Sequence, residues 1–230
     1  PFYLPILALP IAWIVLSKLD PPEPDKSHAF GDYFRLLGSG IKNFKICGLF
    51  IISINTFVIL FGSFLTYLPF ILSQKFQLGP EKIGLMVCTM SFSQSIMATQ
   101  LGRLLTRFSK KQILKTAFLL YMTAMVLFPH MPYVGLMLLP TVLFGMAQGV
   151  NVPTVQSMLA DYAPLERRAA FMSINRWVSQ IGQTLGPLFT GLVYARFGLN
   201  SVFYAGALMA LITFLIIFLF GAKGKDQTPA

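Results

Sequence analysis

The sequence predicts an all-α, polytopic membrane protein, because it has long apolar runs, short gaps between them, and basic residues gathered in alternate gaps. A helix needs about 20 mostly apolar residues to cross about 30 Å of hydrocarbon. Most of the runs approach or exceed that length, and the run at 113–128 can be extended to residue 133. The seven runs are residues 2–16, 46–72, 83–101, 113–128, 134–160, 169–195 and 202–220.

Composition sets the same bounds. Hydrophobic residues make up 55% of the chain and charged residues 11%, which leaves too little polar surface to cover a water-soluble globule of this size. In lipid only helices and closed barrels satisfy the backbone, and the runs lack the period-two alternation of barrel strands. The predicted spans are therefore helices.

The basic residues orient these spans. Threading seven crossings puts most Lys and Arg in one set of gaps, which the positive-inside rule assigns to the cytoplasm of a plasma (inner) membrane. Pro1 then starts outside, and the linker and Ala230 lie inside. Basic residues split among short loops do not form the single solvated face of a nucleic-acid site. The cytoplasmic set holds Lys18, Lys26, Arg35, Lys42, Lys45, Arg103, Arg107, Lys110, Lys111, Lys115, Arg167, Arg168, Lys223 and Lys225, against Lys75, Lys82 and Arg196 outside.

Four segments follow from this threading. Residues 1–17 are expected to be a truncated transmembrane helix, because the run has no initiating Met, no basic stretch before it and no small-residue cleavage site after it. Residues 18–45 form a cytoplasmic linker, residues 46–221 a six-helix transmembrane bundle, and residues 222–230 a cytoplasmic tail. Phe30, Tyr33, Phe34 and Leu37 recur at helical spacing in the linker, which indicates either a short amphipathic helix at the interface or an irregular segment.

Enzyme chemistry is not indicated. The sequence has no HExxH, no G-x-S-x-G and no paired carboxylates within the spans. Cys47, Cys88, His28 and His130 lack metal-ligand spacing. No metal site and no cofactor are expected.

Arg176 is the sharpest single position, because it is a charged side chain about two turns into a span. Such a charge costs about 2.5 to 3.5 kcal/mol at a helix centre, so it needs water, an acid or a cavity. Together with Gln180 and Gln183 it forms a polar stripe at spacings of three and four, which indicates a surface facing a substrate pathway. The alternative is that Arg176 reaches back to the cytoplasmic headgroups.

Uncharged polar residues in other spans extend the candidate pathway. Asn55, Gln94, Gln148 and Asn151 are the positions selected, the last two because Pro153 nearby could break its helix and free backbone carbonyls. The alternative for each is a hydrogen bond between neighbouring helices.

Glycines also recur at helical spacing. Gly145 and Gly149 share one helix, and Gly182 and Gly186 share another, where Pro187 follows directly. Small residues four apart let helix backbones approach closely, so helix packing is favoured over ligand contact. The Gly186-Pro187 pair also provides a point at which the helix can bend.

Residues 102–111, GRLLTRFSKK, resemble the G-x-x-x-D-R-x-G-R-R loop signature of the major facilitator superfamily. Gly102, Arg107, Lys110 and Lys111 carry the match, whereas Thr106 replaces the acid and Ser109 the second glycine, as in the degenerate copy of the carboxyl-terminal half. Gly102 is expected to allow close approach of a neighbouring helix. The loop's basic groups are explained equally by positive-inside anchoring.

A second resemblance lies at residues 161–168, DYAPLERR, which is similar to the P-x-E-R-R-type loop common in the superfamily. The layout then matches helix six, the central linker and helices seven to twelve of such a transporter. The fold class implied is a six-helix half-bundle of a major facilitator fold plus one preceding transmembrane helix. An amino-terminal six-helix half is expected upstream.

The function implied is secondary active transport of a small solute by alternating access, as a proton-coupled efflux (drug-type) antiporter. No Asp or Glu lies deep in these six helices, so a proton-carrying carboxylate would belong to the other half. The expected partners are a small-molecule solute, protons as coupling ion, and the lipid bilayer. Uptake or facilitated diffusion of a sugar, organic acid or peptide remains open, as does a non-transporting membrane scaffold or sensor.

Overall fold

A computed structural model describes residues 44–222 together with residues 10, 13 and 17. The chain divides into two units, residues 1–35 and 36–230, and the fold described below is that of residues 44–222. The expected truncated helix, linker and tail lie outside the described residues, apart from positions 10, 13, 17, 44, 45 and 222. The same holds for the amphipathic helix expected in the linker.

The described bundle is helical almost throughout, as the apolar runs predict. Its first rod is continuous and consists of α3 (Phe44–Phe57), the π-helix η2 (Val58–Leu65) and α4 (Thr66–Phe76). The later elements are α5 (Pro80–Leu105), α6 (Lys110–His130), η3 (Val134–Met137), α7 (Leu138–Tyr162), η4 (Leu165–Arg167), α8 (Arg168–Phe197) and α9 (Leu199–Ala222).

Four helical stretches in the described part are long and apolar enough to cross a membrane by length and composition. They are Phe44–Phe76, Lys110–His130, Val134–Tyr162 and Leu199–Leu219. Helices α5 and α8, with 26 and 30 residues, are as long but more polar. Their length corresponds to about 39 and about 45 Å at about 1.5 Å per residue, which also suffices for a crossing.

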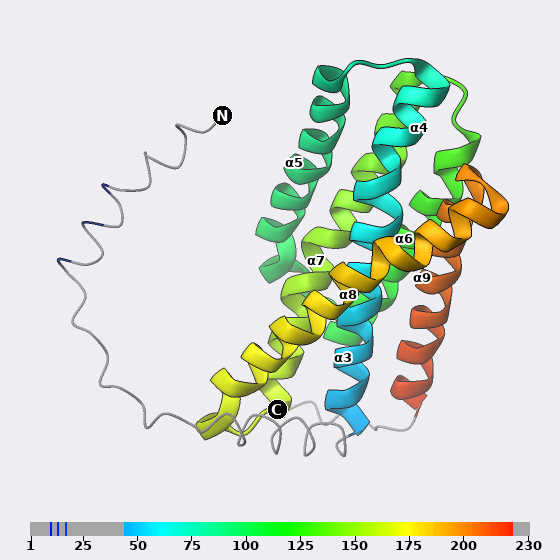
Figure 1. Cartoon of the computed structure of the whole chain (residues 1–230). Coiled ribbons are helices and arrows are strands. Elements are labelled where there is room, and N and C mark those ends of the chain that lie inside the picture. Colours follow the sequence, from blue (N-terminus) through cyan, green and yellow to red (C-terminus); the bar gives the residue numbers. More distant parts are fainter. Residues whose placement is uncertain (1–9, 11–12, 14–16, 18–43, 223–230) are drawn as a thin grey trace. The chain divides into compact units, whose positions relative to one another are not determined.

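The helices pack in a defined order. Helix α7 lies along α5 and α6, α6 also lies along α9, and α8 contacts α3, η2 and α9. Figure 1 shows α8 crossing the first rod obliquely. Helix α5 makes little contact with α6, and α8 makes little contact with α5. Helices α3, α7 and α8 come together at one place.

An aromatic cluster forms the densest part of the core. Phe64 of η2 stacks on Phe144 of α7 with ring centroids 4.2 Å apart, and Tyr121 of α6 meets the Phe144 ring edge-on at 4.9 Å. All three side chains are fully buried. Because lipid tails are as apolar as these rings, the cluster stabilises the bundle by van der Waals contact.

Ser109 has a local role that its position in the loop motif does not suggest. It caps α6: Ser109 Oγ accepts a hydrogen bond from the Gln112 amide at 3.3 Å, and the Ser109 amide donates to Gln112 Oε1 at 2.9 Å. This capping box satisfies two of the amides that a helix start leaves without partners. The serine in place of glycine therefore defines where α6 begins.

Candidate functional site

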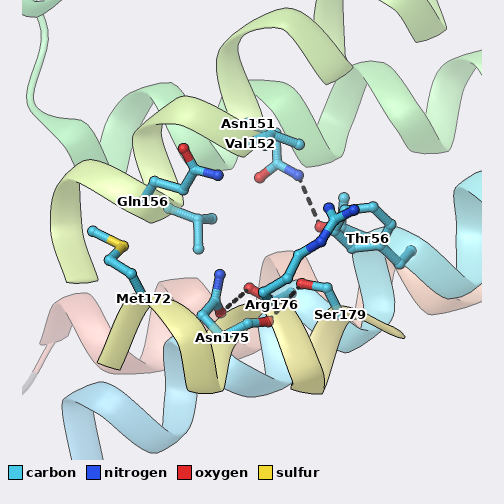
Figure 2. Close-up of a pocket in the computed structure, with 11 residues that line it drawn as sticks. Thr56, Asn151, Val152, Gln156, Met172, Asn175, Arg176 and Ser179 are labelled. Carbon is cyan, nitrogen blue, oxygen red and sulfur yellow. Dashed lines mark hydrogen bonds between the residues drawn. The ribbon is translucent and has the colours of Figure 1, made fainter. Parts of the chain in front are cut away.

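A cavity of about 340 Å³ lies between α3, α7 and α8, and Figure 2 shows the side chains around it. Thr56 is 12 residues beyond Phe44, the first residue of α3, so the cavity lies about 18 Å along that helix. Its polar walls are Ser53, Thr56, Asn151, Gln156, Asn175, Arg176 and Ser179, and its apolar walls are Phe57, Val152, Val155 and Met172.

Hydrogen bonds tie the walls of the cavity together. Ser53 Oγ donates to Asn175 Oδ1 at 2.8 Å and so joins α3 to α8. Ser179 Oγ donates to the Asn175 carbonyl at 2.8 Å. Since Ser53 and Asn175 are buried, the bond from Ser53 holds the Asn175 side chain in one orientation at the cavity wall, whereas the bond from Ser179 goes to the Asn175 backbone.

Asn151 links α7 to α3. Its Nδ2 donates to Thr56 Oγ1 at 2.8 Å, and Thr56 Oγ1 donates in turn to the Ile52 carbonyl at 2.8 Å. Asn151 is 0% exposed, yet its Oδ1 has no hydrogen-bond partner among the described residues. A buried acceptor without a partner costs about 1 to 3 kcal/mol, so this atom is an energetic liability until something donates to it.

Arg176 lies eight residues into α8 and is exposed at the cavity. Within the part of the chain that the structure describes, no hydrogen bond or ion pair engages its guanidinium. The acidic residues of that part are Glu81, Asp161 and Glu166, which stand at helix ends or in loops. Among the described residues, the cavity is therefore lined by one cation and no carboxylate.

The other predicted pathway residues lie apart from this cavity. Asn55 Nδ2 donates to Thr213 Oγ1 of α9 at 2.8 Å, and buried Gln148 accepts a hydrogen bond from the Tyr121 hydroxyl of α6. Both side chains therefore join neighbouring helices. Gln94 is half-buried on α5, and its backbone carbonyl faces Gly149 of α7.

The residues of the predicted polar stripe on α8 lie in different surroundings. Arg176 lines the cavity, Gln180 lies in an open groove with Trp177 and Thr184, and Gln183 is half-buried outside both. On another side of α8, Gly182 approaches the Ile54 carbonyl of the first rod.

Several cavity residues were not selected from the sequence, notably Ser53, Thr56, Asn175 and Ser179. Asn175 and Ser179 are four residues apart and flank Arg176, so helical spacing around that charge was the available signal. No comparable signal marks Ser53 and Thr56, because small hydroxyl residues are common in membrane helices. Pro153 does not break α7, which continues through it.

The predicted packing glycines lie at helix contacts. A Cβ built on Gly145 would lie 2.4 Å from the Met90 carbonyl of α5, and one on Gly149 would lie 2.4 Å from the Gln94 carbonyl. On α8, a Cβ on Gly186 would lie 3.0 Å from the Gly62 amide of η2. Pro187 follows inside a continuous α8.

The loop motif contains an ion pair. Lys110 Nζ lies 2.6 Å from Asp161 Oδ2 and so joins the start of α6 to the end of α7. Arg107 is exposed, and Lys111 stands in the first turn of α6. The close approach expected at Gly102 is not found among the described residues, because a Cβ there would meet nothing within 4 Å. Gly102 sits in the exposed last turn of α5.

Comparisons with known proteins agree with this architecture. A model of the Major Facilitator Superfamily matches residues 46–230. The chain is 26% identical over 182 residues to the quinolone resistance protein NorA of Staphylococcus aureus, covering 78% of this chain and 47% of that protein. It is 28% identical over 149 residues to a probable chloroplastic anion transporter 4 of Oryza sativa subsp. japonica, covering 63% and 25%.

Among solved structures, the fold is similar to that of the POT family transporter PepTSo, with a TM-score of 0.65 at 15% sequence identity. The match covers 81% of this chain and 39% of that one. The chain thus spans about half the length of NorA and less of the other two proteins. The matched model, the helical bundle and the loop motif together show that the chain belongs to the major facilitator superfamily.

Proposed function

We propose that the intact protein is a secondary transporter that moves a small solute across the membrane by alternating access. The cavity between α3, α7 and α8 would be one wall of its pathway. The observation that carries this proposal is the lone cation Arg176 at a cavity with no carboxylate in the described spans. Placing such a charge within a span is costly and is typical of substrate pathways.

The facing wall, in this proposal, is a second six-helix half. Support comes from length, because this chain covers 47% of NorA. Support also comes from α5 and α8, which are the more polar of the long helices and expose Ser91, Ser95, Gln180 and Thr184. Residues 1–230 alone would then leave half of the pathway without a wall and would not transport.

Proton-coupled efflux is the form of transport that we propose for the whole protein, in the plasma membrane with the linker and tail on the cytoplasmic side. The similarity to a quinolone resistance protein supports this direction. Because no acidic residue lies deep in the described helices, the proton-binding carboxylate would lie in the facing half. The loop motif at Gly102, Arg107, Lys110 and Lys111 would anchor the cytoplasmic face.

The test is solute flux in sealed, everted membrane vesicles that hold the intact protein. With the interior made acidic, a proton-coupled exporter accumulates a quinolone inside, and a protonophore abolishes the accumulation. Movement in the opposite direction would support an uptake carrier instead. The absence of gradient-dependent flux of a quinolone, an organic acid and a peptide would refute transport and favour a scaffold or sensor.

Arg176 provides the test at the level of one residue. The change Arg176→Ala is expected to lower the flux at least about tenfold, since one charge-assisted contact is lost. Arg196→Ala, in the last turn of the same helix, is the matched control and should keep the flux. Unchanged flux in well-folded Arg176→Ala protein would contradict a pathway role for this residue.

A further inference from the structure

The hydroxyl groups of the cavity are already committed to the protein. Ser53, Thr56 and Ser179 donate to Asn175 Oδ1, the Ile52 carbonyl and the Asn175 carbonyl, each at 2.8 Å. A hydroxyl has one proton to donate. These three side chains therefore have no donor left for a bound solute.

Four polar side chains of the cavity wall keep a hydrogen-bonding group without a partner among the described residues. Gln156, exposed on α7, has an amide that can both donate and accept, so it does not discriminate between solutes. Arg176 offers a guanidinium fork, and the Asn175 amide offers Nδ2, because only its oxygens take part in the wall's hydrogen bonds. Asn151 offers the acceptor Oδ1, fully buried and without a partner. Figure 2 shows the Asn151 amide with its nitrogen toward Thr56 and its oxygen on the opposite side.

These open groups differ in what they require. The guanidinium and the Asn175 Nδ2 donate, and the guanidinium carries a positive charge with a fork that matches a carboxylate. Asn151 Oδ1 accepts, so it requires an O–H or N–H group. A chloride ion cannot donate to Asn151 Oδ1, and a neutral alcohol can donate and accept but does not neutralise the guanidinium charge.

Building on the proposed transport function, we propose that the solute is a small organic anion that carries both a carboxylate and a hydroxyl or N–H group. Arg176 binds the carboxylate, with Asn175 Nδ2 beside it, and Asn151 Oδ1 accepts the hydrogen bond from the donor. The described wall alone encloses about 340 Å³, which already suffices for a small ligand, since ligand pockets range from about 300 to 1,000 Å³.

Three compounds of nearly equal size test this assignment. The first, 3-hydroxybenzoate, has both a carboxylate and a hydroxyl, benzoate lacks the hydroxyl, and 3-hydroxybenzamide lacks the charge. Binding to the intact, detergent-purified protein is read from the increase in its thermal midpoint at millimolar concentration, because a ligand stabilises the state that binds it. We expect affinity to fall about fivefold for benzoate and at least about tenfold for 3-hydroxybenzamide.

Substitutions assign each preference to its residue. Arg176→Gln is expected to weaken 3-hydroxybenzoate at least about tenfold and to remove the preference for the acid over the amide. Asn151→Leu is expected to remove only the preference for 3-hydroxybenzoate over benzoate. Arg196→Gln is the control and should change neither. The comparison of the three compounds on the unaltered protein stands even where a variant does not fold.

Equal binding of the acid and the amide, no binding of 3-hydroxybenzoate, or undiminished binding by folded Arg176→Gln protein would each overturn the assignment. The outcome is separable from that of the proposed function. Gradient-dependent solute flux without hydroxybenzoate binding sinks the anion assignment alone. Binding with the expected preferences but no flux of any solute sinks the transport proposal and leaves the site standing.

Discussion

The two sides of α7 differ in how closely they pack against neighbouring helices. Toward α5, glycines at 145 and 149 let the helix approach until backbone carbonyls lie where side chains would be. Toward α8, the same helix presents Asn151 and Gln156 to a cavity. On one side glycine allows tight helix packing, and on the other side amide side chains border a cavity. A single helix in this bundle therefore forms both a tightly packed contact, called the seam below, and a cavity wall.

The two sides of α7 also differ in the kind of interaction that they make with neighbouring helices. The α5 side gains van der Waals contact along its length, whereas the side that faces the cavity is bonded to α3 by the hydrogen bond from Asn151 to Thr56. In lipid, tight packing stabilises without any hydrophobic driving force, and interhelical hydrogen bonds contribute about 0.6 to 2 kcal/mol each. A cavity wall can therefore be held by a few bonds if the opposite seam is dense.

The largest effect is expected at the seam. In Gly145→Ala the new methyl group would lie 1.9 Å from Ser93 Oγ and 2.4 Å from the Met90 carbonyl. Because a backbone carbonyl cannot move aside, α5 and α7 must separate, at a cost of about 3 kcal/mol. The measurement is the free energy of unfolding of the detergent-solubilised protein in SDS.

Gly84→Ala on α5 is the matched control, because a Cβ there meets nothing within 4 Å. It adds the same methyl group and the same gain in helix propensity, up to about 1 kcal/mol, without touching the seam. If the two variants are equally stable, the α5 side of α7 is not closed as the structure describes.

An intermediate effect is expected where the wall is bonded to α3. Thr56→Val keeps the shape of the side chain but removes the acceptor for Asn151 Nδ2. Since both residues are buried, the unfolding free energy should fall by about 1.5 kcal/mol. Thr123→Val, exposed on α6 and bonded only to its own helix, should stay within about 0.5 kcal/mol of the parent. An equal loss of unfolding free energy in Thr123→Val would mean that the hydrogen bond between Asn151 and Thr56 does not stabilise the protein more than a bond within one helix.

The smallest effect is expected on the cavity side. Val152→Ile adds one carbon, as Gly145→Ala does, but next to open space. The change in unfolding free energy should stay within about 0.5 kcal/mol. Val150→Ile, on the same helix but 3% exposed and packed near Ile113 and Ala117, should cost about 1 to 2 kcal/mol. Equal costs at the two positions would mean that both sides of α7 are filled.

Much of the bundle was predictable because membrane helices can be recognised in a sequence by their length and apolar composition. The first rod, α6, α7 and α9 follow from their apolar runs, and the short gaps predict antiparallel neighbours. The π-helix η2 was not predictable, because it arises where Val58–Leu65 passes α8 and no local signal marks it. The capping role of Ser109 was hidden by its resemblance to a motif position.

The candidate site was predictable only in part. A lone arginine within a span stands out in any sequence, and Arg176 does line the cavity. Asn55 and Gln148 carry the same type of side chain as Asn151 but bond to Thr213 and Tyr121 between helices. An amide in a span has two uses, and only its neighbours in space decide between them.

By itself, then, the sequence determined that the chain is a bundle of membrane helices, because hydrocarbon thickness and backbone hydrogen bonding leave no other solution for such apolar runs. Its loop motifs added the resemblance to the major facilitator superfamily. Tertiary structure alone decided which polar groups meet. The oblique crossing of α8 over the first rod brings Ser53 to Asn175 and leaves Arg176 at an open space. Contacts between residues more than 100 positions apart depend on helix crossing, which no local pattern encodes.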